Sequence, residues 1–263
     1  MIDDKIIQNI ISLKYKFEKI AAKGYIKGIY NNNAAIGRTF ENELNLNMNK
    51  ESVPDYHGIE LKTRRTYSKS MITLFNAVPD GDKPLELNRI RDRYGWPYKR
   101  DKEYKALYAE VYGNIAKYAG IKYKYKLEVN KQEEKIYLCI YDKEGDLVEK
   151  EVYWSFDYLK EKLINKLQVL ALIEVWPNKI NGWNYFKYYK INFYTLKGFD
   201  TFISLIEIGI IKLSIKIDIY MDKENYGKMY DHGCGFSIAK KDINLLFSNI
   251  NFLVNKHEKQ YKN

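Results

Sequence analysis

The chain is poor in cysteine and histidine, and each scarcity excludes a class of protein. Of its 263 residues, two are cysteine and three are histidine. Two cysteines cannot build a disulfide scaffold or a cysteine-rich zinc module, and they fit a reducing compartment. The three histidines are scattered along the sequence, which argues against a metal site built from histidine.

Long uncharged hydrophobic runs are also missing. The most apolar stretch, Phe199 to Ile219, contains Asp200, Glu207, Lys212 and Lys216. Such a stretch cannot cross a bilayer, because each charge would lie in hydrocarbon. The N-terminus carries acids where a secretory signal carries bases. We therefore expect a cytoplasmic protein.

What the chain has in excess is positive charge. Lys and Arg number 44 against 34 Asp and Glu, a net charge of +10, and the pI is about 9.2. A basic protein favours a polyanionic partner such as nucleic acid. However, the 25 tyrosines and the richness in Ile, Asn and Lys are also what an AT-rich genome imposes on any protein. Charge alone leaves the choice open.

The hydrophobic pattern predicts alternating helices and strands. Hydrophobic residues make up 46% of the chain, which excludes intrinsic disorder. Helical spacing predicts helices over 3–22, 37–47, 85–94, 156–168, 198–207 and 240–249. Strands are expected over 58–65, 70–78, 106–112, 123–129, 135–142, 148–154, 169–176, 184–194 and 211–220. Residues His257 to Asn263 are expected to form a frayed tail.

One short segment carries the clearest chemistry. Pro54-Asp55 breaks the chain before a strand that contains Glu60 and Lys62. Residues two apart on a strand point to the same face, and Asp55 is expected at the mouth of a strand hairpin. Two carboxylates can hold Mg²⁺ beside a scissile phosphate, and a lysine can orient water or offset transition-state charge.

The spacing alone is a weak signal. Glu-x-Lys occurs three times, at Glu60, Glu103 and Glu133, and only the first lies in an apolar strand after a Pro-Asp turn. On spacing alone, a surface salt bridge between Glu60 and Lys62 is the favoured alternative.

Resemblance adds to this pattern. The run Ile36 to Leu44, then Pro54-Asp55, then Gly58-Ile59-Glu60-Leu61-Lys62-Thr63 resembles the MvaI/BcnI family of type II restriction endonucleases. It is also similar to the mismatch-repair nicking enzyme MutH. Two further blocks agree in order, namely Arg93 to Pro97 with Lys105 to Tyr108, and Gly227 to Ile238.

The resemblance assigns roles to single residues. It implies that Glu41 is a helix carboxylate, with Glu43 as its rival, that Asp55 and Glu60 hold Mg²⁺, and that Lys62 is the catalytic lysine. It also implies that His232 contacts a base edge, for instance by donating to guanine N7 or O6. Further expected DNA contacts are Arg64, Arg65, Lys69, Lys228, Asp231 and Lys240, although a solvated strand end explains the first three nearly as well.

One position departs from the family. Members often carry an arginine soon after the Asp-His-Gly run, where this chain has Ser237. The departure puts the target sequence in doubt and leaves the chemistry unaffected.

The expected architecture is an α/β restriction-endonuclease-like mixed sheet flanked by helices. A catalytic lobe (1–115) and a DNA-recognition lobe (116–263) would form a basic cleft within one folding unit. The expected activity is Mg²⁺-dependent, sequence-specific cleavage of double-stranded DNA by a monomer that nicks the strands in turn, with a methyltransferase as a possible host partner. The alternatives are a MutH-like nickase that needs a repair partner and a non-catalytic DNA-binding module.

Overall fold

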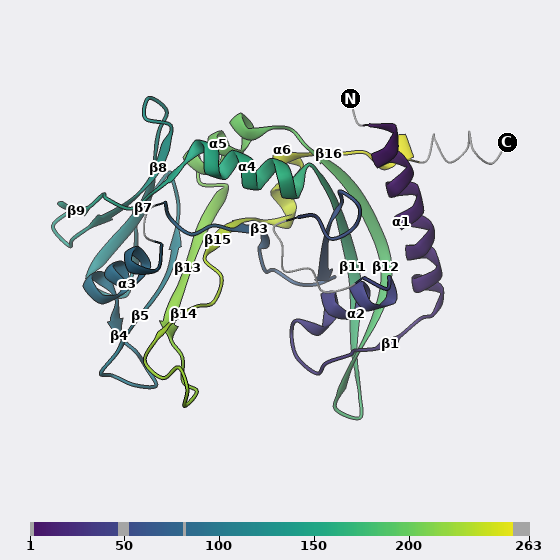
Figure 1. The fold of residues 1–263 in the computed structure, drawn as a ribbon, viewed down its shortest axis with the longest axis horizontal. Coiled ribbons are helices and arrows are strands. Elements are labelled where there is room, and N and C mark those ends of the chain that lie inside the picture. The colour runs from purple at the N-terminus through teal and green to yellow at the C-terminus, as the bar shows by residue number, and fades with distance from the viewer. Residues whose placement is uncertain (1–2, 47–52, 81–82, 255–263) are drawn as a thin grey trace. The chain divides into compact units, whose positions relative to one another are not determined.

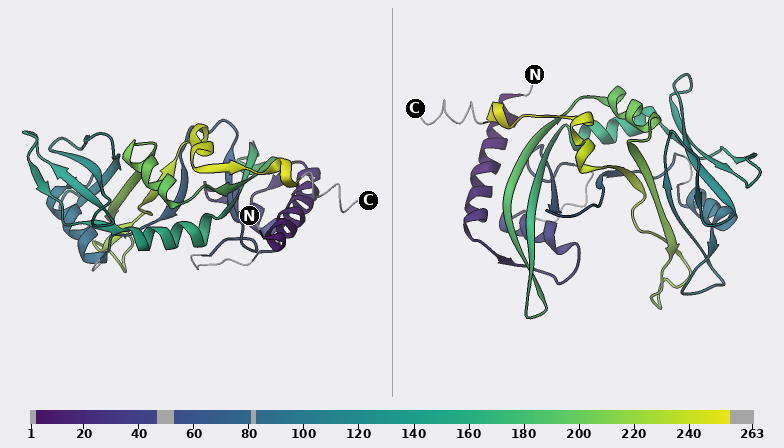
Figure 2. Two further views of the ribbon diagram at one scale, coloured as in Figure 1. Left: turned by 90° about the horizontal axis from the view of Figure 1, so that it is seen from above. Right: turned by 180° about the vertical axis from the view of Figure 1, so that it is seen from behind.

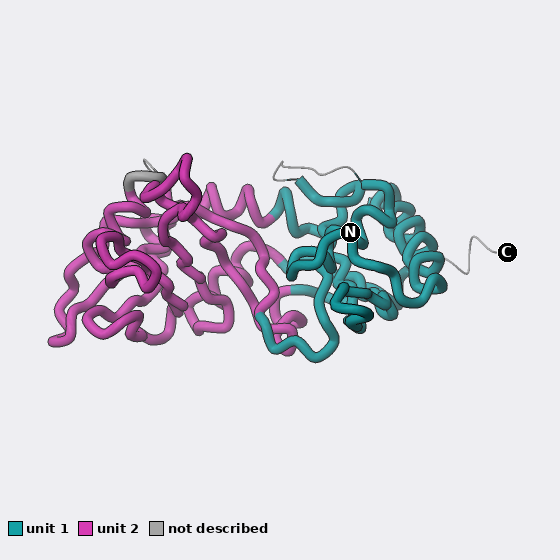
Figure 3. Tube along the Cα trace, turned by 90° about the horizontal axis from the view of Figure 1, so that it is seen from below, with its two compact units in different colours: residues 1–70, 164–197, 247–263 teal, residues 71–163, 198–246 magenta. Residues whose placement is uncertain are grey.

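The computed structural model describes residues 3–46, 53–80 and 83–254 (Figure 1). The chain folds into two compact units (Figure 3). Unit 1 comprises residues 1–70, 164–197 and 247–263, and unit 2 comprises residues 71–163 and 198–246. The units interleave along the chain.

Unit 1 is a mixed sheet with two helices. Its strands follow the order β1-β12-β11-β2, with β16 paired to β12. Strand β2 runs parallel to β11, and the other pairings are antiparallel. The elements are α1 (Asp4–Ala22), α2 (Ala35–Glu43), β1 (Ile26–Lys27), β2 (Glu60–Arg65), β11 (Val169–Ile180), β12 (Trp183–Leu196) and β16 (Phe247–Asn249).

Helix α1 covers this sheet for reasons visible in its sequence. Asp3 caps its first turn by accepting a hydrogen bond from the backbone of Lys5. Leu13, Phe17 and Ile20 recur at helical spacing and are buried in the unit 1 core. Figure 2 shows the helix lying along the long ribbon of β11 and β12, and it packs against β12.

The β11–β12 ribbon is the longest feature of unit 1. Val169 to Val175 are buried throughout, because this part of β11 is a central strand covered on both faces. Beyond Val175 the ribbon loses its neighbour β2 and becomes exposed. Asn181 and Gly182 form its turn, both with positive φ (50° and 78°), as a type I′ hairpin requires.

Unit 2 holds two antiparallel sheets. One has the order β3-β15-β13-β5-β4 with β14 on β13, and the other has the order β10-β8-β7-β6 with β9 on β8. Its strands are β3 (Ile72–Asn76), β4 (Trp96–Pro97), β5 (Lys105–Val111), β6 (Lys117–Ala119), β7 (Tyr123–Asn130), β8 (Lys135–Tyr141), β9 (Leu147–Glu149), β10 (Tyr153–Ser155), β13 (Ile211–Ile219), β14 (Met229–Asp231) and β15 (Gly235–Ile238). Its helices are α3 (Lys83–Tyr94), α5 (Phe199–Glu207), η1 (Lys240–Asp242) and α6 (Ile243–Leu246), while α4 (Phe156–Leu167) contributes to both units.

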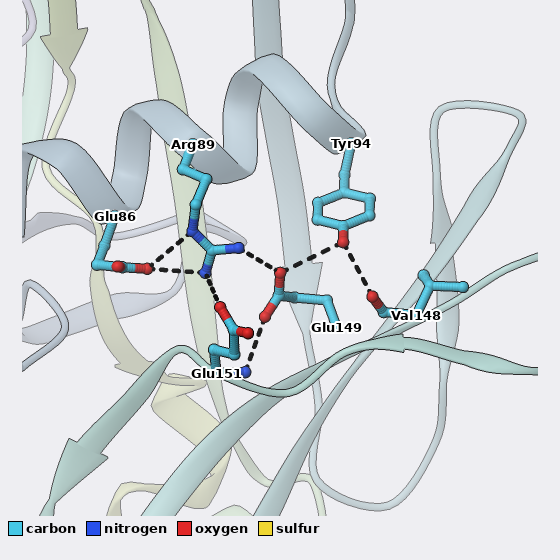
Figure 4. A network of polar contacts seen from close by, with 6 residues as sticks. All are labelled: Glu86, Arg89, Tyr94, Val148, Glu149 and Glu151. Atoms are coloured by element: carbon cyan, nitrogen blue, oxygen red, sulfur yellow. Dashed lines mark hydrogen bonds and ion pairs between the residues drawn. The ribbon is translucent and has the colours of Figure 1, made fainter.

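A partly buried ion network connects helix α3 to strand β9 inside unit 2 (Figure 4). Arg89 donates to Glu149 at 2.6 Å and to Glu86 at 2.8 Å, and Tyr94 donates to Glu149. The Glu149 side chain is only 2% exposed. Burial by itself raises the pKa of Glu149, but the Arg89 bond and the backbone N–H of Glu151 outweigh it, and the net pKa is lowered.

The structure corrects three expectations about elements. The helix expected over 240–249 ends at Leu246, because residues Phe247–Asn249 pair with β12 as a strand. The strand expected over 148–154 is two short strands, β9 and β10. The hairpin expected at Asp55 is reduced to a two-residue turn between Tyr56 and Ile59, because β2 pairs with β11 and β3 pairs with β15.

Most of the expected helices and strands are present within a few residues of their predicted bounds. Pattern reading missed the short strands β1, β4, β6, β14, β15 and β16. The tail expected over 257–263 lies outside the described residues. No helix in the described part of the chain is long and apolar enough to span a membrane.

Candidate active site

A tight turn positions Asp55 at the start of β2. Tyr56 and Ile59 exchange backbone hydrogen bonds of 3.0 and 2.8 Å across His57 and Gly58, which have φ values of 42° and 89°. Two consecutive positive φ angles define a type I′ turn and explain the glycine. The Asp55 Oδ2 atom then accepts a 3.0 Å hydrogen bond from the Leu61 backbone. The carboxylate is therefore fixed beside β2.

Glu60 and Lys62 lie on the same face of β2, as the period of two predicts. Lys62 Nζ donates to Glu60 Oε1 at 2.6 Å. The Glu60 side chain is 1% exposed, and its Oε2 atom is buried without a hydrogen-bond partner. Burial raises the pKa of Glu60 to about 7, with the charge of Asp55 adding to the rise and the charges of Lys62 and Lys166 opposing it.

Lys166 is a site residue that the sequence did not reveal. It lies in the last turn of α4, and its Nζ is 3.6 Å from Glu60 Oε1. The reason is topological. Strands β2 and β11 are parallel, so the helix end that leads into β11 arrives at the edge where β2 begins. No local motif carries this signal, because Lys166 is more than 100 residues from Glu60.

Helix α2 lies against β2 on the opposite side of the sheet from Glu60. A Cβ on Gly37 would lie 3.4 Å from Thr63 Oγ1 and 3.8 Å from Glu41 Oε1, which is ordinary van der Waals contact, so the helix lies close to the strand without requiring a glycine there. The carboxylate of Glu41 itself pairs with Arg38 at 3.0 Å. Its rival Glu43 pairs with Lys23.

Asp55 and Glu60 are the carboxylates that the structure brings to one strand end. Among the residues it describes, no three His, Cys, Asp or Glu side chains gather closely enough to hold a metal ion. The structure thus does not join Glu41 to Asp55 and Glu60 as a third ligand. Two carboxylates still fit Mg²⁺, which commonly takes one or two of them and completes its shell with water and phosphate. The unpartnered, buried Glu60 Oε2 is the atom best suited to that role.

The cations expected to follow the active strand have different environments. Arg64 is buried, donates to the Ser68 carbonyl and faces Glu174, and burial lowers the pKa of its guanidinium against the opposing charge of Glu174. Its Nε and Nη1 atoms are buried without a hydrogen-bond partner, and its role as a DNA contact stays a prediction. Lys69 is exposed, and Arg65 is half-buried with a 3.2 Å bond to Asn33.

In unit 2, the side chain of His232 contacts a carboxylate and an aromatic ring. Its Nε2 lies 2.9 Å from the Oδ1 of Asp218, which is itself buried and also accepts from Tyr108. The ring of Tyr230 packs 4.1 Å from the imidazole, centroid to centroid. The imidazole remains exposed and its Nδ1 edge has no bond within the described chain. Asp218 was not predicted, because nothing near it in sequence resembles a motif.

Asp231 and Lys228, two other residues expected to contact DNA in unit 2, make hydrogen bonds within the protein. Asp231 Oδ1 accepts from the backbones of Gly233 and Cys234 at 2.9 and 2.8 Å, which shapes the turn that carries His232. Lys228 is exposed and donates to Asn225. Lys240 lies half-buried in η1.

Comparison with known proteins identifies the family and the fold of the chain. The model of the MvaI/BcnI restriction endonuclease family matches residues 14–247. A solved complex of restriction endonuclease MvaI with its cognate DNA substrate is similar at a TM-score of 0.83 and 29% identity, covering 90% of this chain and 95% of that one. MvaI in the absence of DNA is similar at a TM-score of 0.61 and 27% identity, covering 95% and 98%.

No curated protein matches the chain. The structural likeness confirms the expected α/β restriction-endonuclease fold. Because the family model spans most of the sequence, the protein belongs to the MvaI/BcnI restriction endonuclease family and is a type II site-specific deoxyribonuclease.

Proposed function

We propose that the protein cleaves double-stranded DNA at a short specific sequence in a Mg²⁺-dependent reaction at Asp55, Glu60 and Lys62. One observation carries the proposal. Glu60 is buried, one of its oxygens is held by Lys62, and the other has no partner. A buried carboxylate oxygen without a hydrogen-bond partner destabilises the folded protein unless a cation binds to it. The solved complex of MvaI with DNA supports the same substrate class.

Each residue of the candidate active site has its own role in the proposed cleavage. Bound Mg²⁺ would supply a water of lowered pKa and offset charge on the phosphate. Asp55 and Glu60 would hold it, and the Leu61 N–H bond keeps Asp55 in place. The ammonium of Lys62 would orient the attacking water or stabilise the pentavalent phosphate. Lys166 brings a second positive charge to the same carboxylate oxygen. Glu41 would act from α2 without joining that pair.

Sequence recognition is proposed for the surface around His232. Because its Nε2 is engaged by Asp218, the Nδ1 edge is left for a base. A neutral imidazole that donates from Nε2 accepts at Nδ1, which suits the amino group of cytosine or adenine. A protonated imidazole donates there instead, which suits guanine N7 or O6. Because Asp218 binds Nε2, the Nδ1 edge of the ring is the one that can contact a base.

We also propose that the enzyme acts as a monomer that nicks one strand, reorients and nicks the other. The chain supplies one set of Asp55, Glu60 and Lys62, and one set can cut one strand in each engagement. Supercoiled plasmid should first give nicked circles and then linear DNA. A stable dimer that cuts both strands without a nicked intermediate would contradict this.

The test of the activity uses purified protein, plasmid DNA and Mg²⁺, with EDTA as the blank. Discrete fragments are expected from the wild type and none from Lys62→Ala. Lys135→Ala is the matched control, since it removes the lysine of another Glu-x-Lys, on β8. Nicking only, or cleavage only with an added repair protein, would favour the MutH-like alternative. Binding without cleavage by wild type and Lys62→Ala alike would favour a DNA-binding module.

A further inference from the structure

A polar pocket of about 650 Å³ lies in unit 1, away from the carboxylates. It forms where the loop before α2, the end of β2 and the β11–β12 hairpin meet. Asn31 fastens the loop to the hairpin, because its amide donates to the Gly182 carbonyl and accepts from the Asn184 backbone. The pocket is lined by Asn31, Asn32, Asn33, Arg65, Pro177, Asn178, Lys179 and Asn184.

The hydrogen bonds of this pocket fix the orientation of its amides. Asn32 Oδ1 accepts from the backbone of Ala35 at 3.1 Å, and Asn178 Oδ1 accepts from the backbone of Lys179 at 2.8 Å. Asn33 Oδ1 accepts from the Arg65 guanidinium at 3.2 Å. Backbone N–H groups and guanidinium only donate, so each partner must be the amide oxygen.

The consequence is a surplus of donors. The Nδ2 groups of Asn32, Asn33 and Asn178 have no hydrogen bond within the described part of the chain. The oxygen of each amide accepts a hydrogen bond within the protein, and its two N–H donors remain available. A ligand that matches them must offer acceptors.

The charges of the pocket also favour a ligand that offers acceptors. Arg65 and Lys179 are its charged lining residues, and both are positive. Helix α2 begins at Ala35, next to the pocket, and has no acid in its first turn. The start of a helix adds partial positive charge. A group that is both negative and acceptor-only fits this surface, and a phosphodiester has both properties.

We propose that this pocket binds a phosphodiester group of the DNA backbone at a phosphate other than the scissile one. The proposal rests on the DNA-cleaving function above. Arg65 lies three residues beyond Lys62 on β2, or about 10 Å at roughly 3.3 Å per residue.

The test measures binding to a duplex containing the recognised site, with Ca²⁺ replacing Mg²⁺ and salt varied. Asn33→Asp keeps the oxygen that receives Arg65 but replaces the donor with a negative oxygen, so affinity should fall about tenfold or more. Lys179→Met should weaken binding severalfold and reduce the slope of log K against log salt by about 1. Lys187→Met is the matched control, because Lys187 is exposed on the same hairpin outside the pocket. It should bind like the wild type.

Single methylphosphonates identify the contact, because each neutralises one phosphate. One position should weaken the wild type and have no further effect on Asn33→Asp or Lys179→Met. Cleavage at saturating DNA should stay within about twofold of wild type, since neither residue belongs to the catalytic site.

The outcomes separate the two proposals. If the wild type cuts DNA but both pocket variants bind as it does, the pocket proposal is overturned and the function stands. The affinity lost by the pocket variants could instead depend on exchange of A·T for G·C pairs and be unaffected by methylphosphonates. In that case the pocket contacts base edges in a groove, and the phosphate assignment is wrong. If the wild type neither binds nor cuts DNA, the function fails, and the pocket proposal fails with it.

Discussion

Lys62 and Glu60 form a 2.6 Å ion pair in which the carboxylate is almost fully buried and the ammonium is about a quarter exposed. On spacing alone this pair could have been a solvated surface salt bridge. Burial of Glu60 contradicts that interpretation, because surface pairs are solvated on both sides. The pair instead leaves a carboxylate oxygen without a partner at a strand end where Asp55 and Lys166 also lie.

Removing the second ammonium at this carboxylate should slow cleavage without preventing binding. Lys166→Met takes away a charge 3.6 Å from Glu60 Oε1, and we expect the rate at saturating DNA to fall by about tenfold. Single-turnover cleavage and Ca²⁺-supported binding measure the two effects separately. Lys160→Met, on the exposed side of the same helix, is the control. Equal rates for Lys166→Met and the control would show that the second ammonium does not contribute to cleavage.

Glu60 should make the metal-free protein less stable as pH rises. Its pKa is about 7 in the folded chain against an ordinary value of 4.5, so the folded state binds more protons between these values. Stability from this group is therefore lost as pH rises through that window and is level above it. Between pH 5 and 8 the loss should be about 2–3 kcal/mol.

Glu60→Gln has no charge to lose and should lack this component. Urea unfolding in EDTA at pH 5 and pH 8 gives the difference between the variant and the wild type. If that difference does not change with pH, the Glu60 pKa is not raised in the folded protein.

The Arg89 network should contribute strongly to the stability of unit 2. Arg89→Met leaves the Glu149 carboxylate buried without its cation, which typically costs about 3 kcal/mol or more. Glu151→Gln is the control, because Glu151 is 79% exposed and 3.4 Å from Arg89. Its change should be within about 0.5 kcal/mol. Denaturant unfolding compares the two, and similar losses would mean that burial of Glu149 is not the cause.

Asp218 and His232 should act as one recognition element. Asp218→Ala removes the acceptor that holds Nε2, and His232→Ala removes the ring. Each should lower kcat/KM on the recognised sequence by about 1–3 kcal/mol of transition-state binding. The double variant should lose no more than the worse single variant, because both changes disable one contact. Additive losses would contradict this, and thermal unfolding of each variant controls for misfolding.

The sequence by itself determined the local features of the site. A period of two placed Glu60 and Lys62 on one face of β2, and a glycine after His57 allowed the turn that presents Asp55. Helical spacing of apolar residues located α1. These results depend on residues a few positions apart, whose geometry the backbone itself sets.

Only the tertiary structure decided which distant segments meet. The parallel pairing of β2 with β11 brings Lys166 to Glu60 and buries Arg64 beside Glu174. The edge of β12 turns the expected end of a helix at Phe247–Asn249 into a strand. The donor-rich pocket combines three segments that are far apart in the chain. Local periodicity fixes the face on which a side chain lies, whereas long-range strand pairing fixes what that face meets, and no spacing within a short window encodes it.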